Sequence, residues 1–192
     1  TLETLSFSKE SSSLPFTVFK ATALGPMSLF KKKGDKIDFT NSEEETWKRV
    51  LNRIDTCCEN AKKMGVNLLI DAEESWFQDA IDEIAESLME KYNKETPFVY
   101  TTLQMYRKDR LEYLKNLHEN ATKKGFKIGV KLVRGAYIEK ENSRALQLGI
   151  SSPICESKLM TDLNFNAGLD FILKNLEDCS LFLGSHNEQS VK

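Results

Sequence analysis

With 192 residues and 40% hydrophobic content, the chain is long enough to bury one sizeable core, and its composition argues against both a disordered and a membrane-spanning protein. Its formal net charge is -2, with acidic and basic residues interspersed along the chain. This balance argues against a nucleic-acid-binding protein, which carries a basic face, and offers no attraction to an anionic membrane surface.

The four cysteines argue against a disulfide framework and against a zinc site. Cys57 and Cys58 are adjacent, whereas Cys155 and Cys179 stand alone. Reduced thiols fit a cytosolic or mitochondrial matrix environment. The segment Thr1–Ser13 is rich in serine but has no arginine and no apolar run, so it does not resemble a signal or transit peptide. Because the sequence does not begin with Met, we expect an upstream segment to have been removed.

Five short apolar runs predict buried β-strands, since each is bounded by Gly, Pro or polar residues. They begin near Phe16, Val66, Phe98, Ile128 and Leu181. Stretches with apolar residues at helical spacing follow the first run and separate the others. These predicted helices cover residues 42–64, 77–92, 106–124, 139–148 and 161–176. The basic run Lys31–Lys33, followed by Gly34 and Asp35, predicts a solvated loop.

The ends of the predicted helices carry recognisable signals. Asn41 or Ser42 can cap the first long helix, and Gly65 can end it. The pattern Ala-x-Lys-x-Gly occurs twice just before a strand, at 61–65 and at 121–125. With the strand at Phe98 between the two copies, this spacing gives a βα unit of roughly thirty residues, the length of a right-handed parallel crossover.

Parallel strands separated by helices place the chain in the α/β class, with two candidate architectures. A doubly wound sheet is complete with five strands, whereas a (β/α)8 TIM-like barrel needs eight strands and roughly 250 residues. The sequence stops soon after the run at Leu181, with no helix to cover the last strand. We therefore expect residues 1–192 to form one partial barrel domain, which lacks both the N-terminal and the C-terminal parts of the barrel.

Charged and polar side chains occupy the carboxyl ends of the predicted strands, where parallel α/β folds place their active sites. Lys20 is a candidate to hold an anionic substrate or to act as a Schiff-base amine, and a solvated edge-strand lysine is an equally good interpretation. Asp71 can orient that lysine, transfer a proton or cap the next helix. Gln104 suits the edge of a heterocyclic ring, although taken alone it fits a turn residue better.

The segment Lys131–Tyr137 is the most informative, because two cations lie in an apolar strand that runs into a glycine turn. Lys131 and Arg134 point to opposite faces if the strand is regular. Arg134 beside Gly135 is typical of a phosphate-binding strand end, where the missing side chain lets an anion approach the backbone. His186 also follows a strand and can either bond to a ligand or occupy a turn. No GxGxxG, P-loop or metal-spaced cluster is present, so no metal site is expected.

Five segments, taken together and in order, carry a resemblance to a known family. They are Leu69–Glu74, Gln104–Tyr106, Lys131–Tyr137, Pro153–Asp162 and Ser185–Asn187. They resemble the proline dehydrogenase (proline oxidase) family in its eukaryotic mitochondrial form. The resemblance implies a distorted barrel that holds FAD, oxidises L-proline to Δ1-pyrroline-5-carboxylate and passes electrons to ubiquinone. It also implies peripheral association with the matrix side of the mitochondrial inner membrane.

The same resemblance implies roles for single residues. Lys20 matches the lysine that pairs with the substrate carboxylate, and Asp71 matches the catalytic acid that hydrogen-bonds and positions it. Lys131 matches a catalytic cation beside the reactive edge of the flavin, where positive charge favours the reduced, anionic form. Tyr137 matches an aromatic residue that lines the substrate pocket. The residues that match other cofactor contacts are Ala72, Gln104, Arg134, Gly135, Ala136, Ser185 and His186.

The chain also departs from the family pattern. Many bacterial members carry Arg at the position of Lys131 and Lys at that of Arg134. A later family motif, with paired arginines that grip the substrate carboxylate, is absent from these residues, so we expect the isolated chain to be inactive. Three alternatives stay open: a hydroxyproline dehydrogenase, a Schiff-base barrel lyase that uses Lys20 or Lys131, and a non-catalytic flavodoxin-like binding module.

Overall fold

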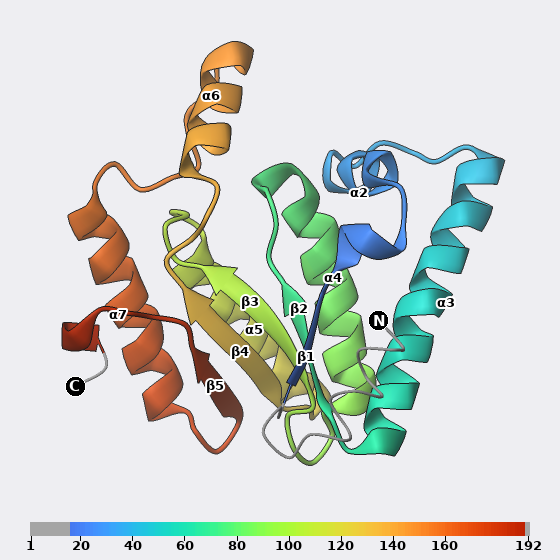
Figure 1. Ribbon diagram of the computed structural model, residues 1–192. Coiled ribbons are helices and arrows are strands. Elements are labelled where there is room, and N and C mark those ends of the chain that lie inside the picture. Colours follow the sequence, from blue (N-terminus) through green and yellow to red (C-terminus); the bar gives the residue numbers. More distant parts are fainter. Residues whose placement is uncertain (1–15, 191–192) are drawn as a thin grey trace.

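Five parallel strands form the sheet around which the molecule is built (Figure 1). In this computed structural model, which describes residues 16–190, the strands are β1 (Phe16–Lys20), β2 (Asn67–Asp71), β3 (Val99–Gln104), β4 (Ile128–Val133) and β5 (Cys179–Leu183). The α-helices are α2 (Met27–Gly34), α3 (Asn41–Met64), α4 (Ser75–Tyr92), α5 (Arg110–Lys124), α6 (Ile138–Leu148) and α7 (Lys158–Lys174). Two short 3-10 helices are η1 (Ala21–Leu24) and η2 (Glu188–Ser190). All five predicted strands are confirmed.

Each strand pairs in parallel with the strand that follows it in the sequence, so the order across the sheet is β1-β2-β3-β4-β5. A flavodoxin-like sheet has the order 2-1-3-4-5, with a reversal at the switch point where its ligand binds. The flavodoxin-like alternative is therefore wrong, because the described strands show no reversal. A strictly sequential order is the one that a (β/α)8 barrel has.

The two faces of the sheet have different characters, because successive side chains of a strand point to opposite sides. On the face that packs against the helices, Leu68 and Ile70 of β2, Leu103 of β3 and Leu132 of β4 are fully buried in the main hydrophobic core. The alternate positions project from the other face. From β1 to β5 they include Phe16, Leu69, Tyr100, Lys131 and Phe182.

The sheet is strongly curled, so that side chains from its first and last strands meet. The ring centroids of Phe16 on β1 and Phe182 on β5 are 5.2 Å apart, and Phe16 also lies 4.9 Å from Tyr100 on β3. In a flat sheet β1 and β5 would be separated by roughly 19 Å, four strand spacings, which two phenyl side chains do not bridge. These three rings come from the odd strands, as do the side chains of one interior layer in a (β/α)8 barrel.

Two helices end as the repeated Ala-x-Lys-x-Gly pattern predicts. Gly65 ends α3 and Gly125 ends α5, both in the left-handed conformation, with φ of 70° and 66°. In both cases the residue after the glycine donates its N–H to the carbonyl oxygen of the alanine, Ala61 or Ala121, at 3.0 Å. The chain therefore turns from helix into strand in the same way at both joints.

The prediction of a solvated loop at Lys31–Lys33 is wrong, because these lysines lie in α2. Burial of Leu29 and Phe30 holds this helix against the core, with the Phe30 ring 5.1 Å from the Trp47 ring. The lysines stay near the surface, where Lys32 pairs with Glu43 at 2.7 Å. A helix of 8 residues with two buried side chains is too short to show a helical repeat in the sequence.

Two helix starts also differ from the expectation. Thr40, rather than Asn41 or Ser42, caps α3: its hydroxyl accepts from the Glu43 N–H at 3.4 Å, and the Glu43 carboxylate accepts from the Thr40 N–H at 2.8 Å. Helix α5 begins at Arg110 instead of at 106. Residues 105 and 106 instead continue beside the end of β4, since their N–H groups donate to the carbonyl oxygens of residues 133 and 134.

Candidate active site at the strand ends

A cavity of about 920 Å³ opens at the carboxyl ends of the five strands. All of the residues that the sequence singles out as site candidates line it, namely Lys20, Asp71, Ala72, Gln104, Lys131, Arg134, Gly135, Ala136, Tyr137, Ser185 and His186. Because parallel strands end at one edge of the sheet, residues far apart in the sequence meet there. The candidates thus share one cavity and are not dispersed over the surface.

Asp71 at the end of β2 and Lys131 on β4 form an ion pair across β3. Lys131 Nζ donates to Asp71 Oδ1 at 2.8 Å, and their side chains are 19% and 30% exposed. Thr102 lies between them on β3; its hydroxyl donates to the Ile70 carbonyl oxygen at 2.9 Å and lies 3.4 Å from Asp71 Oδ1. Partial burial makes such a pair stronger than an ion pair in open solvent. The pair therefore fixes one positive and one negative charge in the cavity wall.

Lys20 at the end of β1 meets Tyr137, which follows β4. Lys20 Nζ donates to the Tyr137 hydroxyl oxygen at 3.0 Å. This hydrogen bond raises the pKa of Lys20 above its ordinary value, and the nearby carboxylates of Glu73 and Asp71 act in the same direction. A lysine that forms a Schiff base needs a lowered pKa, so the surroundings of Lys20 disfavour its use as a nucleophile and favour a permanent cation.

Gln104 ends β3 and links three strand ends, so the interpretation of this residue as a turn residue is wrong. Its Nε2 donates to the Glu73 carbonyl oxygen at 2.8 Å, and its Oε1 accepts from the Ala136 N–H at 3.1 Å. The side chain is buried, and these two bonds fix which end of the amide holds oxygen. Since an amide has two N–H donors and two acceptor lone pairs, one of each is left for a bound molecule.

Arg134 extends toward α7 and the segment after β5. Its Nε donates to Asp162 at 2.6 Å, and its Nη1 and Nη2 donate to the hydroxyl oxygens of Ser185 at 2.9 Å and Ser190 at 3.1 Å. The guanidinium carbon lies 4.3 Å from the centroid of the Phe165 ring. Because arginine has five N–H donors, these contacts leave two for an anion while holding the group in a fixed orientation.

The structure requires glycine at position 135 for a different reason from the one that the sequence suggests. Its φ is 136°, a conformation that other residues rarely adopt, and a Cβ there would lie 2.3 Å from Cδ1 of the Tyr106 ring. The space beside the glycine is thus filled by an aromatic ring. Arg134 lies beyond Val133, the last residue of β4, so strand alternation does not separate it from Lys131 and both line the cavity.

The last candidates follow β5. Ser185 accepts from Arg134 and also from the Asn187 N–H at 3.1 Å, which orders this turn. His186 is exposed and lines the cavity. Six further lining residues were not predicted as site residues, namely Thr102, Val133, Lys158, Leu183, Gly184 and Asn187. Strand alternation with Gln104 would have placed Thr102 on the same face, whereas Lys158, a mostly exposed residue at the start of α7, is distinguished by no sequence pattern.

In residues 16–190 no group of three or more His, Cys, Asp or Glu side chains is arranged to hold a metal ion. Over the same range, no helix combines the length and the apolar character that crossing a bilayer demands. Cys57, Cys58, Cys155 and Cys179 are all free thiols.

Known proteins resemble this chain over nearly its whole length. Residues 4–192 match the family model described as proline dehydrogenase. The carbapenem antibiotics biosynthesis protein CarD of Pectobacterium carotovorum subsp. carotovorum is 31% identical over 191 residues, which are 100% of this chain and 50% of CarD. Mitochondrial proline dehydrogenase 1 of Homo sapiens is 36% identical over 157 residues, which are 80% of this chain and 26% of that protein.

A solved structure shows the same fold. The crystal structure of proline utilization A (PutA) from Bdellovibrio bacteriovorus, inactivated by N-propargylglycine, superposes with a TM-score of 0.84 at 23% identity and covers 99% of this chain and 21% of PutA. The chain thus spans about half the length of CarD and about a quarter of the length of the human protein. With the family model matched from residue 4 to residue 192, this chain belongs to the proline dehydrogenase family.

Proposed function

We propose that the full-length protein that contains these residues oxidises L-proline to Δ1-pyrroline-5-carboxylate with FAD, as the first step of proline catabolism. The observation that carries this proposal is the single cavity at the strand ends. It brings together the Lys20–Tyr137 pair, the Asp71–Lys131 pair and the buried Gln104 amide. Family membership then favours proline oxidation over other reactions of a cation-lined cavity.

The residues around the cavity fit a flavin. Its volume of about 920 Å³ lies near the upper end of the usual range for ligand sites, about 300–1,000 Å³, and is large for a small amino acid alone. Gln104 keeps one donor and one acceptor for the edge of a ring, Lys131 places positive charge in the wall, and Arg134 keeps two N–H groups for an anionic portion. FAD, when bound, supplies the acceptor for a hydride.

In this reaction the proline nitrogen is in its neutral amine form, and the C5–H bond beside it breaks, so that the hydrogen leaves with the electron pair as a hydride to the flavin. The nitrogen lone pair forms the C=N bond, and loss of the remaining N–H proton to solvent gives Δ1-pyrroline-5-carboxylate. Lys20 would bind the substrate carboxylate, because its raised pKa keeps it positively charged. Tyr137, bonded to Lys20, would line the substrate pocket. Asp71 would hold the Lys131 ammonium group in place. These contacts would position the proline ring for hydride transfer, and this positioning is expected to supply much of the rate enhancement.

We also infer that β1 to β5 are consecutive strands of a (β/α)8 barrel, so that residues 1–192 form a partial barrel domain. The sequential strand order, the curl that brings Phe16 to Phe182 and the partial coverage of the relatives support this inference. The paired arginines that the family uses beside Lys20 would lie outside these residues. The isolated chain would then hold half of the carboxylate-binding group and is expected to be inactive.

Substitution of Lys20 tests the proposal. In the full-length protein, Lys20→Met should raise the KM for proline by about 10- to 100-fold, since a charged hydrogen bond to the carboxylate is lost. FAD content should change little. Lys63→Met is the matched control, because Lys63 is an exposed lysine near the end of α3, away from the cavity. An unchanged KM in Lys20→Met would remove this residue from the substrate site.

A visible spectrum separates the proposed function from its rivals. The purified full-length protein should be yellow, and its flavin absorbance should bleach when proline is added. Faster bleaching by hydroxyproline would favour the hydroxyproline dehydrogenase. A colourless protein that borohydride traps on a carbonyl substrate would support the Schiff-base lyase, for which Lys131 stays a candidate amine.

We propose ubiquinone as the electron acceptor and the matrix side of the mitochondrial inner membrane as the location. The relatives from Homo sapiens and Dictyostelium discoideum, 36% and 34% identical, are named mitochondrial, and CarD is bacterial. Cell fractionation tests the location. Proline-dependent reduction of a soluble ubiquinone analogue, compared with consumption of oxygen, tests the acceptor.

A further inference from the structure

Helix α6 follows Tyr137 directly and projects from the body of the molecule (Figure 1). Of its 11 residues, Glu141 and Ala145 are the buried ones. A helix with so little buried surface depends on a few specific contacts for its orientation. The contacts at its first turn therefore help to set where the segment that carries Tyr137 lies.

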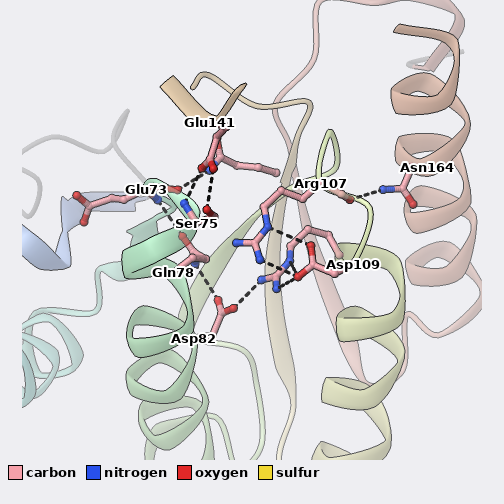
Figure 2. Close-up of polar contacts among 10 residues, drawn as sticks. Glu73, Ser75, Gln78, Asp82, Arg107, Asp109, Glu141 and Asn164 are labelled. Atoms are coloured by element: carbon pink, nitrogen blue, oxygen red, sulfur yellow. Dashed lines mark hydrogen bonds and ion pairs between the residues drawn. The ribbon is translucent and has the colours of Figure 1, made fainter. Parts of the chain in front are cut away.

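Three residues on one side of α6 contact three consecutive residues at the start of α4. Lys140 Nζ lies 2.8 Å from Glu74 Oε1, and the guanidinium carbon of Arg144 lies 4.7 Å from the ring centroid of Trp76. Between these contacts the Glu141 carboxylate accepts twice from Ser75, from its N–H at 2.6 Å and from its hydroxyl at 2.7 Å. Figure 2 shows the two side chains facing each other at the top of α4.

The Glu141–Ser75 contact provides a hydrogen-bond acceptor for a backbone N–H group at the start of α4. The N-terminal N–H groups of a helix lack partners within the helix, and the residue before α4, Glu74, makes no side-chain cap. Glu141 supplies the missing acceptor from another element, and its negative charge suits the positive end of the α4 dipole. Since Glu141 is 1% exposed, bulk water does not compete with it for these donors.

The same contact ties together the two loops that carry site residues. The loop after β2 connects Asp71, the last residue of that strand, to Ser75, and the loop after β4 leads through Tyr137 to Glu141. Gln104 links these loops closer to the sheet, through the carbonyl oxygen of residue 73 and the N–H of residue 136. Glu141 forms a second link farther out, and its own N–H donates to the Tyr137 carbonyl oxygen at 3.0 Å.

We propose that Glu141 is a positioning residue for the substrate end of the cavity: its bonds to Ser75 hold the start of α6 so that the Tyr137 hydroxyl meets Lys20. Glu141 does not line the cavity itself. It acts through the backbone of the first α6 turn and through Tyr137. The inference rests on the proposed function in so far as Lys20 and Tyr137 bind the substrate.

The test compares Glu141→Gln with Glu139→Gln in the full-length protein. Gln is isosteric with Glu, but at position 141 its NH2 group would face the donors of Ser75, whereas Glu139 is exposed and serves as the matched control. Hydrogen exchange of the amides in residues 138–148 should become about tenfold faster in Glu141→Gln and stay unchanged in Glu139→Gln. This measurement needs neither flavin nor substrate, so it stands even if the protein does not oxidise proline.

Kinetics separate a positioning role from a merely structural one. Glu141→Gln should raise the KM for proline by about tenfold with a smaller change in kcat and in FAD content. The effect should largely vanish in a Tyr137→Phe background, because residues that act through one contact are not additive. A normal KM in Glu141→Gln, or an effect that adds in full to that of Tyr137→Phe, would overturn the proposal.

A milder variant covers the case in which Glu141→Gln does not fold. Ser75→Ala removes the hydroxyl contact and keeps the backbone N–H that Glu141 also accepts from. It should speed up exchange in α6 and raise the proline KM in the same direction, by about two- to fivefold. Unchanged exchange in α6 of Ser75→Ala would show that this link does not hold the helix, and the inference would fail.

Discussion

Replacing Gly135 with alanine should destabilise the protein far more than the same replacement at Gly149. Both glycines have positive φ values, 136° and 64°. A Cβ at Gly135 would lie 2.3 Å from Tyr106 Cδ1, whereas nothing lies within 4 Å of a Cβ at Gly149. The Tyr106 ring is 1% exposed, so it has no open space into which it could move.

The expected loss at Gly135 therefore has two parts. The strained backbone conformation costs alanine about 1–2 kcal/mol at Gly149, whose φ of 64° is left-handed, and about 1–3 kcal/mol at Gly135, whose φ of 136° lies outside that region. Displacement of the buried Tyr106 ring adds about 1–3 kcal/mol at Gly135 alone. The free energy of unfolding should fall by about 2–6 kcal/mol in Gly135→Ala and by about 1–2 kcal/mol in Gly149→Ala. The larger loss at Gly135 therefore combines the clash with Tyr106 and the rarer backbone conformation.

Urea unfolding of the full-length protein, followed by tryptophan fluorescence, measures both losses. FAD content provides a second readout, because Gly135 lines the cavity and Gly149 does not. It should fall in Gly135→Ala and stay normal in Gly149→Ala. If both variants lose the same free energy of unfolding, the ring of Tyr106 does not confine position 135 and the argument fails.

Two further predictions concern titratable groups. The hydrogen bond from Lys32, together with those from Thr40, lowers the pKa of Glu43 from 4.5 to about 2. Because the pKa of Glu43 is lower in the folded state, the stabilisation by ionised Glu43 is present above pH 4.5 and is lost as the pH falls toward about 2. The Tm difference between wild type and Glu43→Gln should therefore shrink over this pH range. A constant Tm difference would refute the lowered pKa of Glu43. Burial raises the pKa of Cys58 to about 12, whereas Cys155 is more exposed. Alkylation near pH 8 followed by peptide mass spectrometry should therefore modify Cys155 first and Cys58 only on unfolding, and equal rates would contradict the buried position.

Much of the site could be predicted from the sequence, because in a parallel α/β fold the position of a residue along its strand determines its position in space. Asp71, Gln104 and Lys131 all lie at or near strand ends, so correct strands were enough to bring them to one edge. The ends of α3 and α5 at Gly65 and Gly125 could also be predicted from the sequence, because a left-handed helix end favours glycine.

The remaining contacts depend on packing that no local pattern encodes. Ser75 and Glu141 are 66 residues apart, and nothing near either residue indicates that one caps the other. The same holds for Gly135, whose neighbour Tyr106 comes from the loop after a different strand. Helix α2 was missed because its lysines dominate the local composition while only Leu29 and Phe30 are buried.

The sequential pairing of the strands also bears on how the chain is made. When β2 leaves the ribosome, its partner β1 has already been synthesised, and the same is true of each later strand. The sheet can therefore grow by one βα unit at a time during translation, because none of the described strands inserts between two strands that come earlier in the sequence. Each new strand covers the edge that the previous strand left open, so that at every stage the unpaired edges are the outer edge of β1 and that of the newest strand.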